Sequence, residues 1–330
     1  MKVTIPEDLK TAVPQTQWGK ILTATPVIMT VVATMLAGLA SSEMTRAQYD
    51  RAMAAQQQSK AGDQWSFFQA KRLRAALQRN TVDLLQINGD FRPLDPALLQ
   101  QSVQGVPGES PEAAKLKADL GTTLGSAGCR QAIELLKNGE LPANGAPAIP
   151  SENIKAAMAG VENSRPEPEI WQSLAKISDR ELDAALDAAR DRAQEFDAAT
   201  RPVNQSIDHL EALLTSQRRL APGTAPAQST VFRDFAAARL QYTAQRYDAE
   251  SRLNQAIANL YELQVRKSNH SAERHHARSQ RFFFGMLAAQ AAVIIATFAI
   301  AARQRNLLWS LAAFAGIAAI ALAIYVYLYV

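Results

Sequence analysis

The sequence predicts an all-α membrane protein with three transmembrane helices and a long antiparallel helical hairpin, coiled-coil-like, with a small helical insertion at its tip. Three observations predict it: three uncharged stretches, two long polar segments that adjoin them, and prolines gathered between those segments. The expected divisions are a tail (1–20), spans (21–42, 282–302 and 307–328), helical arms (43–90 and 231–281) and an insertion with proline-rich loops (91–230).

The spans are predicted from stretches that hold no charged residue. These stretches cover 21–42, 282–302 and 306–330, with 22, 21 and 25 residues. A helix needs about 20 apolar residues to cross the roughly 30 Å hydrocarbon core of a bilayer. Buried core helices are the alternative, but three such runs in so polar a chain favour the membrane.

The first stretch has two interpretations, a retained anchor and a cleaved secretory signal. Small residues near Gly38 resemble a cleavage site, and Lys20 precedes the run. A signal usually has an apolar core of about 7 to 15 residues, and this run is longer. We therefore expect a retained anchor, while cleavage stays open.

The distribution of basic residues bears on orientation. Three spans place the N-terminus and the 303–306 link on one side, and the middle region and the C-terminus on the other. Lys2, Lys10 and Lys20 favour a cytoplasmic N-terminus, but the arms also carry basic residues close to the membrane. Short loops obey this charge rule best. We expect a multi-pass membrane protein with the large segment outside the cytoplasm; the opposite orientation stays open.

The two arms are expected to form long helices. Apolar residues recur at helical spacing in both arms, and the pattern of 231–281 is close to a heptad repeat, from Phe232 and Leu240 to Leu260. Because the arms have similar lengths and opposite directions, we expect them to pair as an antiparallel coiled coil. Packing of each arm on other subunits or on the insertion is the alternative.

The insertion is expected to hold short helices. Ser178 and Glu181 form a capping box that opens a helix predicted to reach about Ala199. We expect Pro202 to break that helix, with another helix over 203–220, because a proline removes one hydrogen bond of the helix.

Two stretches carry a resemblance to a known family. They are GDQWSFFQAKRLR at 62–74 and LNQAIANLYELQVRKSNHSAERHHARSQRFFFGMLAAQ at 253–290, and the C-terminal tail adds to them. These segments resemble a family of bacterial membrane proteins, domain-of-unknown-function family 4337. The resemblance covers the arms and spans but not 91–230. It implies a membrane-anchored helical hairpin, located in the bacterial inner membrane, and brings no activity or site residue.

A group of polar residues close to the second span is a candidate site. It consists of His270, His275, His276, Arg274, Arg278 and Arg281. Such a group can bind anionic headgroups and respond to pH. Zinc usually takes three or four protein ligands, and no clear third ligand is near, so we predict no metal site. A solvated helix face is the alternative.

The aromatic cluster Trp65, Phe67 and Phe68 is predicted to pack against protein or to bind a partner. The nearest histidine to Cys129 is His209, 80 residues further along the chain, and no phosphate-binding loop occurs. We therefore predict no catalytic residue and no cofactor. The net charge of +4, without a basic stripe, argues against nucleic-acid binding.

The expected function is that of a non-enzymatic scaffold in the lipid bilayer. It would self-associate as a homo-oligomer through its arms or spans and hold an unknown protein partner. An oligomeric pore or envelope-stress effector is the alternative. An enzyme with its site in the insertion is a third possibility, without a motif to support it.

Overall fold

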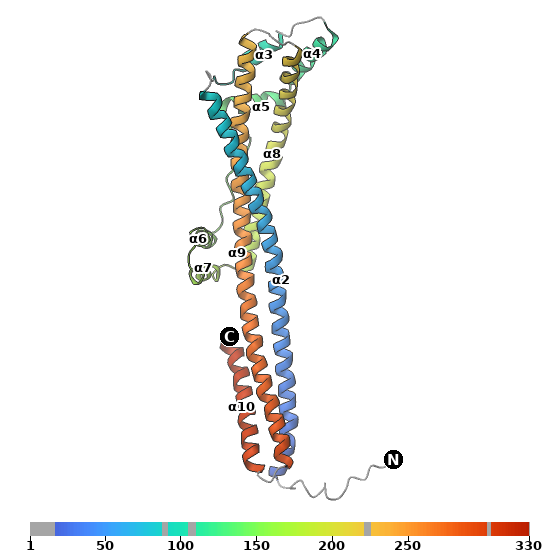
Figure 1. The fold of residues 1–330 in the computed structure, drawn as a ribbon, viewed down its shortest axis with the longest axis vertical. Coiled ribbons are helices and arrows are strands. Elements are labelled where there is room, and N and C mark those ends of the chain that lie inside the picture. The colour runs from blue at the N-terminus through green and yellow to red at the C-terminus, as the bar shows by residue number, and fades with distance from the viewer. Residues whose placement is uncertain (1–16, 88–91, 105–109, 221–225, 302–304, 330) are drawn as a thin grey trace, which may run out of the picture. The chain divides into compact units, whose positions relative to one another are not determined.

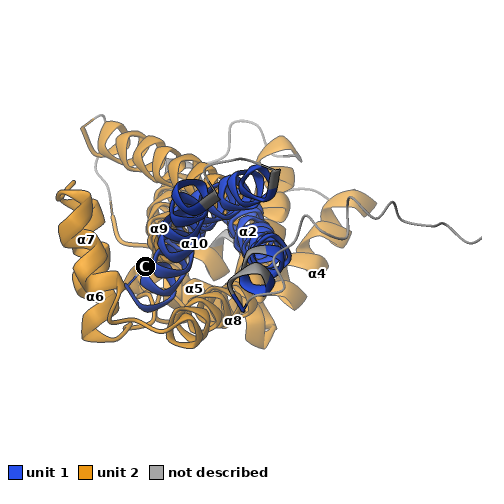
Figure 2. Ribbon diagram, turned by 90° about the horizontal axis from the view of Figure 1, so that it is seen from below, with its two compact units in different colours: residues 1–56, 265–330 blue, residues 57–264 orange. Residues whose placement is uncertain are grey.

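The computed structural model describes residues 17–87, 92–104, 110–220, 226–301 and 305–329. Every regular element in these residues is an α-helix, which confirms the predicted all-α class. The chain divides into unit 1, residues 1–56 and 265–330, and unit 2, residues 57–264 (Figure 2). Most of the predicted tail lies outside the described residues.

Two long helices contribute to both units. They are α2 (Gln17–Ile87) and α9 (Pro226–Ala301), which run antiparallel within each unit (Figure 1). In unit 1 the Ser279 hydroxyl donates to the Ala40 carbonyl oxygen at 2.7 Å. In unit 2 Arg79 pairs with Asp248 at 3.3 Å. The predicted antiparallel hairpin is thus confirmed.

The pairing of α2 with α9 uses small residues spaced by multiples of seven positions, which we call the small-residue seam; on α2 the repeat is interrupted once, at the half-buried Phe68. On α2 the seam comprises Ala33, Ala40, Ala47, Ala54, Ala61, Ala75 and Val82, and on α9 it comprises Ala237, Ala244, Ser251, Ala258, Val265, Ala272 and Ser279. Each of these side chains is at most 7% exposed. Small side chains let two helix backbones approach closely. A repeat of seven keeps the same face toward the partner when the helices supercoil.

The large apolar residues of the second arm face other helices than expected. Ile257, Leu260 and Tyr261 belong to a core that includes Leu182 and Leu186 of the insertion. The heptad-like spacing of the large apolar residues in the second arm predicted that they would pair the two arms. The seam performs that pairing, and the larger side chains fill the wider space beside α8 (Asp179–Leu220).

Unit 1 contains the apolar parts of α2 and α9 together with α10 (Arg305–Tyr329). Its fully buried side chains include Ala289, Ala292, Ala296, Ala312 and Ala319. The outward-facing large apolar side chains include Val27, Val31, Met35, Phe284, Ile294, Phe298, Phe314 and Ile317. Helices that associate in lipid have small residues inside, and large apolar residues outside would face the acyl chains. Three described helices are long and apolar enough to span a membrane.

The remaining helices belong to unit 2. They are α3 (Pro96–Gln104), α4 (Pro111–Gly125), α5 (Ala127–Asn138), α6 (Glu152–Glu162), α7 (Glu167–Leu174) and α8. Helices α4 and α5 form a core with α8 and α9 that includes Leu120, Ile133 and Leu210. Helices α6 and α7 form a second core with α8 and α9. The serines at 110, 126 and 151 cap α4, α5 and α6.

The predicted break at Pro202 is wrong, because α8 continues through it to Leu220. Phe196 before the proline and Val203 and Ile207 after it are all buried. The packing of both halves offsets the lost hydrogen bond, which costs about 3 kcal/mol or more in a helix interior. Tertiary contacts thus override the local effect of the proline.

Candidate functional site

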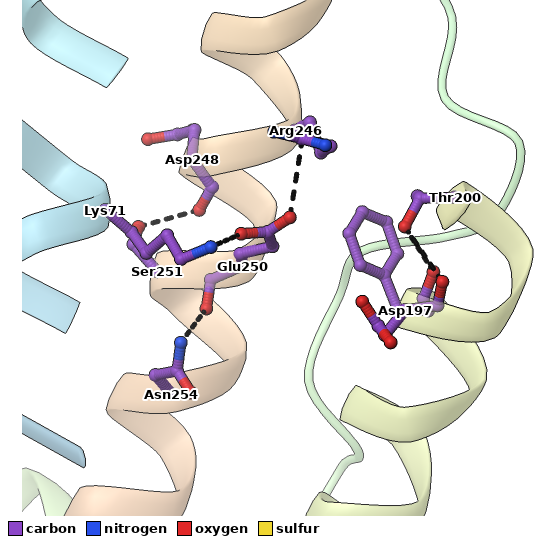
Figure 3. A network of polar contacts seen from close by, with 9 residues as sticks. Lys71, Asp197, Thr200, Arg246, Asp248, Glu250, Ser251 and Asn254 are labelled. Carbon is purple, nitrogen blue, oxygen red and sulfur yellow. Dashed lines mark hydrogen bonds and ion pairs between the residues drawn. The ribbon is translucent and has the colours of Figure 1, made fainter. Parts of the chain in front are cut away.

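The densest group of charged contacts in unit 2 surrounds Glu250 of α9 (Figure 3). Its carboxylate accepts a hydrogen bond from the Lys71 ammonium of α2, and Arg246 Nε lies 3.5 Å from its other oxygen. The Glu250 backbone carbonyl accepts from Asn254 at 2.9 Å. One half-buried carboxylate therefore ties α2 to α9 and orients Arg246.

More cations than carboxylates gather at this position. Lys71 and Arg246 lie 5.0 and 4.7 Å from the centre of the Tyr247 ring, and Arg74 lies 5.9 Å from it. The neighbouring Asp248 pairs with Arg79 at 3.3 Å and with Arg252 at 3.7 Å. Among the residues just named, five cations thus accompany two carboxylates, and four of the five are paired with one of them. The arrangement is suited to holding helices and binding anions, and it presents no nucleophile beside a base.

The candidate group near the second span does not form one site. His275 Nδ1 bonds to Glu43 Oε2 of α2, and its Nε2 lies 4.0 Å from Asp50 Oδ2. His276 instead contacts Gln280 of its own helix at 3.0 Å. His275 therefore joins α2 to α9 within unit 1, a role that its position in the sequence did not indicate.

The basic members of that group make other contacts than His275 does. Arg281 lies 5.9 Å from the ring of Tyr325 of α10. Arg274 is exposed, and Arg278 and His270 are half-buried. Arg278 Nε and His276 Nδ1 are buried without a hydrogen bond.

The three residues of the aromatic cluster also differ in their surroundings. Trp65 and Phe68 are half-buried and make an edge-to-face contact at 5.4 Å, and Arg72 lies 5.7 Å from the Phe68 ring. Phe67 is 53% exposed. Two of the three rings therefore pack within unit 2, and Phe67 faces outward.

Cys129 and the acidic residues offer no evident reactive centre. Cys129 is 1% exposed in the core of unit 2, and burial raises the pKa of its thiol. Within the described ranges, no three histidine, cysteine or acidic side chains come together in an arrangement that could hold a metal ion.

A surface that the sequence analysis did not single out lies on α2 in unit 2. Leu73, Leu77, Leu84 and Ile87 are 63%, 55%, 59% and 79% exposed. Their spacing of four, seven and three residues places them on one face of the helix. We call this set the exposed α2 stripe. The helical spacing of these four residues is the signal in the sequence that could have revealed the stripe.

Comparison with known proteins agrees with the resemblance seen in the sequence. Residues 18–115 match the family described as Domain of unknown function (DUF4337). The match includes the first span and the first arm, and it extends beyond residue 90, where we expected the resemblance to stop. The similarity noted at 253–290 and in the tail lies outside the matched residues. No curated protein and no solved structure matches the chain.

Proposed function

We propose that this chain is a non-enzymatic scaffold of the bacterial inner membrane that assembles with copies of itself through the exposed α2 stripe. The observation that supports the proposal is the stripe, four large aliphatic side chains exposed on a helix of unit 2. Burying one such side chain contributes about 1.5 to 3 kcal/mol. Large exposed apolar patches in water commonly mark interaction sites.

A second copy is the partner that suits this surface best. The spacing of the stripe is that of a coiled-coil seam, and Asn80 occupies its intervening position. A polar asparagine within an apolar seam specifies register in coiled coils. Copies inserted with one topology present identical stripes in the same direction, so the stripes match in parallel and in register.

The test is the oligomeric state of the full chain in detergent, measured by light scattering after size exclusion. We expect the wild-type chain to be a dimer or larger and Leu77→Lys/Leu84→Lys to be a monomer with unchanged helicity. Thr81→Lys/Gln86→Lys is the matched control, since both side chains are exposed and lie outside the stripe. A monomeric wild-type chain, or an oligomer that persists in the leucine variant, contradicts the proposal.

Cross-linking tests the alignment. In a Cys129→Ser background, Asn80→Cys should form a disulfide-linked dimer readily under mild oxidation, because parallel stripes bring the two positions together. Asp83→Cys, which is exposed off the stripe, should do so less readily. Equal yields would argue against a parallel pair.

We also propose that the N-terminus is cytoplasmic and that the large segment lies outside. Ile149 is 84% exposed, so Ile149→Cys in the Cys129→Ser background gives an accessible probe. A second probe at position 304 reports on the other side. We expect an impermeant maleimide to label position 149 in intact cells. Labelling of position 149 only after lysis would show that the large segment lies in the cytoplasm.

The basic residues near the second span support a proposed contact with anionic headgroups. Arg274 is exposed on α9, and the half-buried Arg278 follows it one helical turn later. Basic residues near a membrane surface contribute about 1 kcal/mol each in attraction to anionic lipid. Arg274→Gln/Arg278→Gln should reduce co-purified anionic lipid; unchanged lipid content refutes the contact.

A further inference from the structure

An open hollow of about 550 Å³ lies in unit 1 between α2 and α9, just beyond the uncharged stretch that ends at residue 42. We call it the α2–α9 hollow. Both helices line it, with Thr45, Arg46, Tyr49 and Asp50 from α2 and Ser271 and His275 from α9. Its volume falls within the range of about 300 to 1,000 Å³ for ligand pockets.

Two hydrogen-bond acceptors lie close together in the hollow without bonding to each other. Asp50 Oδ2 and His275 Nε2 are 4.0 Å apart, which is too long for a hydrogen bond. His275 Nδ1 bonds to Glu43 Oε2 at 2.5 Å. Because a carboxylate only accepts, Nδ1 carries the proton, and Nε2 of the neutral ring is an acceptor. Both side chains are 22% exposed, so a group with several N–H bonds can reach and bridge them.

Arg46 supplies a positive charge one helical turn nearer to the span. Its side chain is 62% exposed, and it pairs with Glu43 of its own helix at 3.5 Å. Exposed pairs of this kind are weak. Glu43 also has His275 as a partner on α9. Arg46 can therefore turn toward an anion in the hollow without leaving Glu43 unpaired.

The two charges are ordered along α2 as they are in a zwitterionic lipid headgroup. Arg46 is four residues beyond the uncharged stretch, about 6 Å along the helix. The headgroup layer is about 5 to 8 Å thick on each side of the hydrocarbon core. Asp50 lies one turn further out, and Tyr49, 64% exposed, is of a residue type enriched at this interface. In an ethanolamine headgroup the phosphate lies next to the core, and the ammonium can extend outward from it.

We propose that the α2–α9 hollow binds the headgroup of a phospholipid that carries a phosphate and a primary ammonium, that is, a phosphoethanolamine headgroup. Arg46 contacts the phosphate, and the ammonium donates hydrogen bonds to Asp50 and to His275 Nε2. A choline headgroup has no N–H to donate, and a glycerol headgroup has no cation for Asp50. A simple anion would meet the carboxylates of Glu43 and Asp50.

Lipid titration followed by native mass spectrometry tests the proposal on the full chain, purified in detergent and depleted of lipid. The probes are dioleoyl phospholipids with ethanolamine, choline and glycerol headgroups, together with free phosphoethanolamine. The ethanolamine lipid should bind about tenfold more tightly than the choline lipid, because only its ammonium donates hydrogen bonds. Free phosphoethanolamine should bind much more weakly than the lipid, since it has no acyl chains to bury against the apolar helices.

Two variants assign the effect to the hollow. Asp50→Asn keeps the size of the side chain and removes its charge, so it should weaken binding of the ethanolamine lipid about tenfold and leave the glycerol lipid unchanged. Glu273→Gln is the matched control, an exposed carboxylate of α9 outside the hollow. Arg46→Gln should also weaken the ethanolamine lipid. Its control is Arg51→Gln, which is exposed on α2 outside the hollow. Circular dichroism should show the same helicity in all four variants.

Equal affinity for the ethanolamine and choline lipids overturns the proposal, as does full affinity for the ethanolamine lipid in Asp50→Asn. Binding of free phosphoethanolamine as tightly as the lipid overturns the assignment to a membrane lipid. The proposal rests on the membrane location proposed for unit 1. Its failure is distinguishable from failure of self-association, which is read by light scattering, and from failure of the anionic contact, which is read in Arg274→Gln/Arg278→Gln.

Discussion

Unit 1 and unit 2 share one inner construction and differ in what they present outward. In both units α2 and α9 pair through the small-residue seam, as Ala47 and Ala272 show in unit 1 and Ala75 and Ala244 in unit 2. Outside the seam, unit 1 exposes residues such as Val31 and Phe298. Unit 2 has charged contacts such as Lys71 with Glu250.

The difference shows that pairing and environment are encoded at separate positions. Close packing of small side chains works in lipid and in water, because it depends on shape and dispersion contacts. The remaining positions of each helix determine whether its outer surface suits lipid or water. The exposed α2 stripe departs from this rule in unit 2, which is why we assign it to self-association.

The largest effect is expected from enlarging the seam. Ala54→Leu in unit 1 and Ala75→Leu in unit 2 place a large side chain where the alanine is 3% and 1% exposed. Because the two helices must separate, each variant should lose about 3 kcal/mol of unfolding free energy. Denaturation followed by circular dichroism in detergent measures the loss.

The adjacent alanines provide the controls. Ala55 and Ala76 are exposed, so Ala55→Leu and Ala76→Leu should change stability by less than about 0.5 kcal/mol. If only one of the two seam variants is destabilised, the seam is not a common element of the units and the comparison fails.

Glycine-to-alanine substitutions in the two units should differ in cost, because the added methyl group meets backbone in unit 2 and a flexible side chain in unit 1. A methyl group on Gly145 of unit 2 would lie 2.3 Å from Ala249 Cβ and 3.4 Å from its Cα, so Gly145→Ala should cost about 2 kcal/mol. A methyl group on Gly316 of unit 1 would meet Met29 Sδ at 2.5 Å, within a flexible side chain, so Gly316→Ala should cost less.

Gly121 is the control for these substitutions, since nothing lies within 4 Å of an added methyl group. It lies inside α4, so Gly121→Ala should stabilise the chain by up to about 1 kcal/mol. Denaturation followed by circular dichroism in detergent measures all three variants. A larger loss at Gly316 than at Gly145 would contradict the comparison.

Alkaline pH should weaken unit 2 through Tyr242. Burial raises the pKa of Tyr242 in the folded chain to about 12, from an ordinary value near 10. Below about pH 10 the phenol is protonated in both the folded and the unfolded chain. Between about pH 10 and 12 it ionises more readily in the unfolded chain, so the unfolding free energy falls as the pH rises. The unfolding free energy of the wild-type chain minus that of Tyr242→Phe should fall by up to about 2 kcal/mol over this range. A constant difference refutes the prediction.

The smallest effect concerns Cys129, which should be inert while unit 2 is folded. The residue is 1% exposed, and burial raises the pKa of the thiol, so little reactive thiolate is present at neutral pH. Maleimide should react about 100-fold faster after denaturation. Ile149→Cys in the Cys129→Ser background should react quickly in the folded chain.

The fold was largely predictable because long uncharged runs and helical spacing are local signals. The three apolar helices and the antiparallel pairing followed from them. The seam was missed because Ala54 and Ala55 look alike in the sequence, and only burial distinguishes them. The continuity of α8 through Pro202 depends on contacts with distant helices, which local propensity does not contain.

The candidate sites were less predictable, because they depend on register. His275 lies 232 residues from its partner Glu43, and the pairing follows only from the alignment of α2 with α9. The α2–α9 hollow depends on the same alignment, because its walls come from both helices. No motif marks such a site, since its residues come from separate parts of the chain.

The spacing of the seam also restricts how the hairpin can change in length during evolution. One inserted residue turns the rest of a helix by about 100°, which would carry every later alanine away from its counterpart. Seven residues added to α2 and seven added opposite to them on α9 restore the alignment. Relatives with longer or shorter hairpins should therefore differ by paired insertions or deletions of seven residues, steps of about 10 Å.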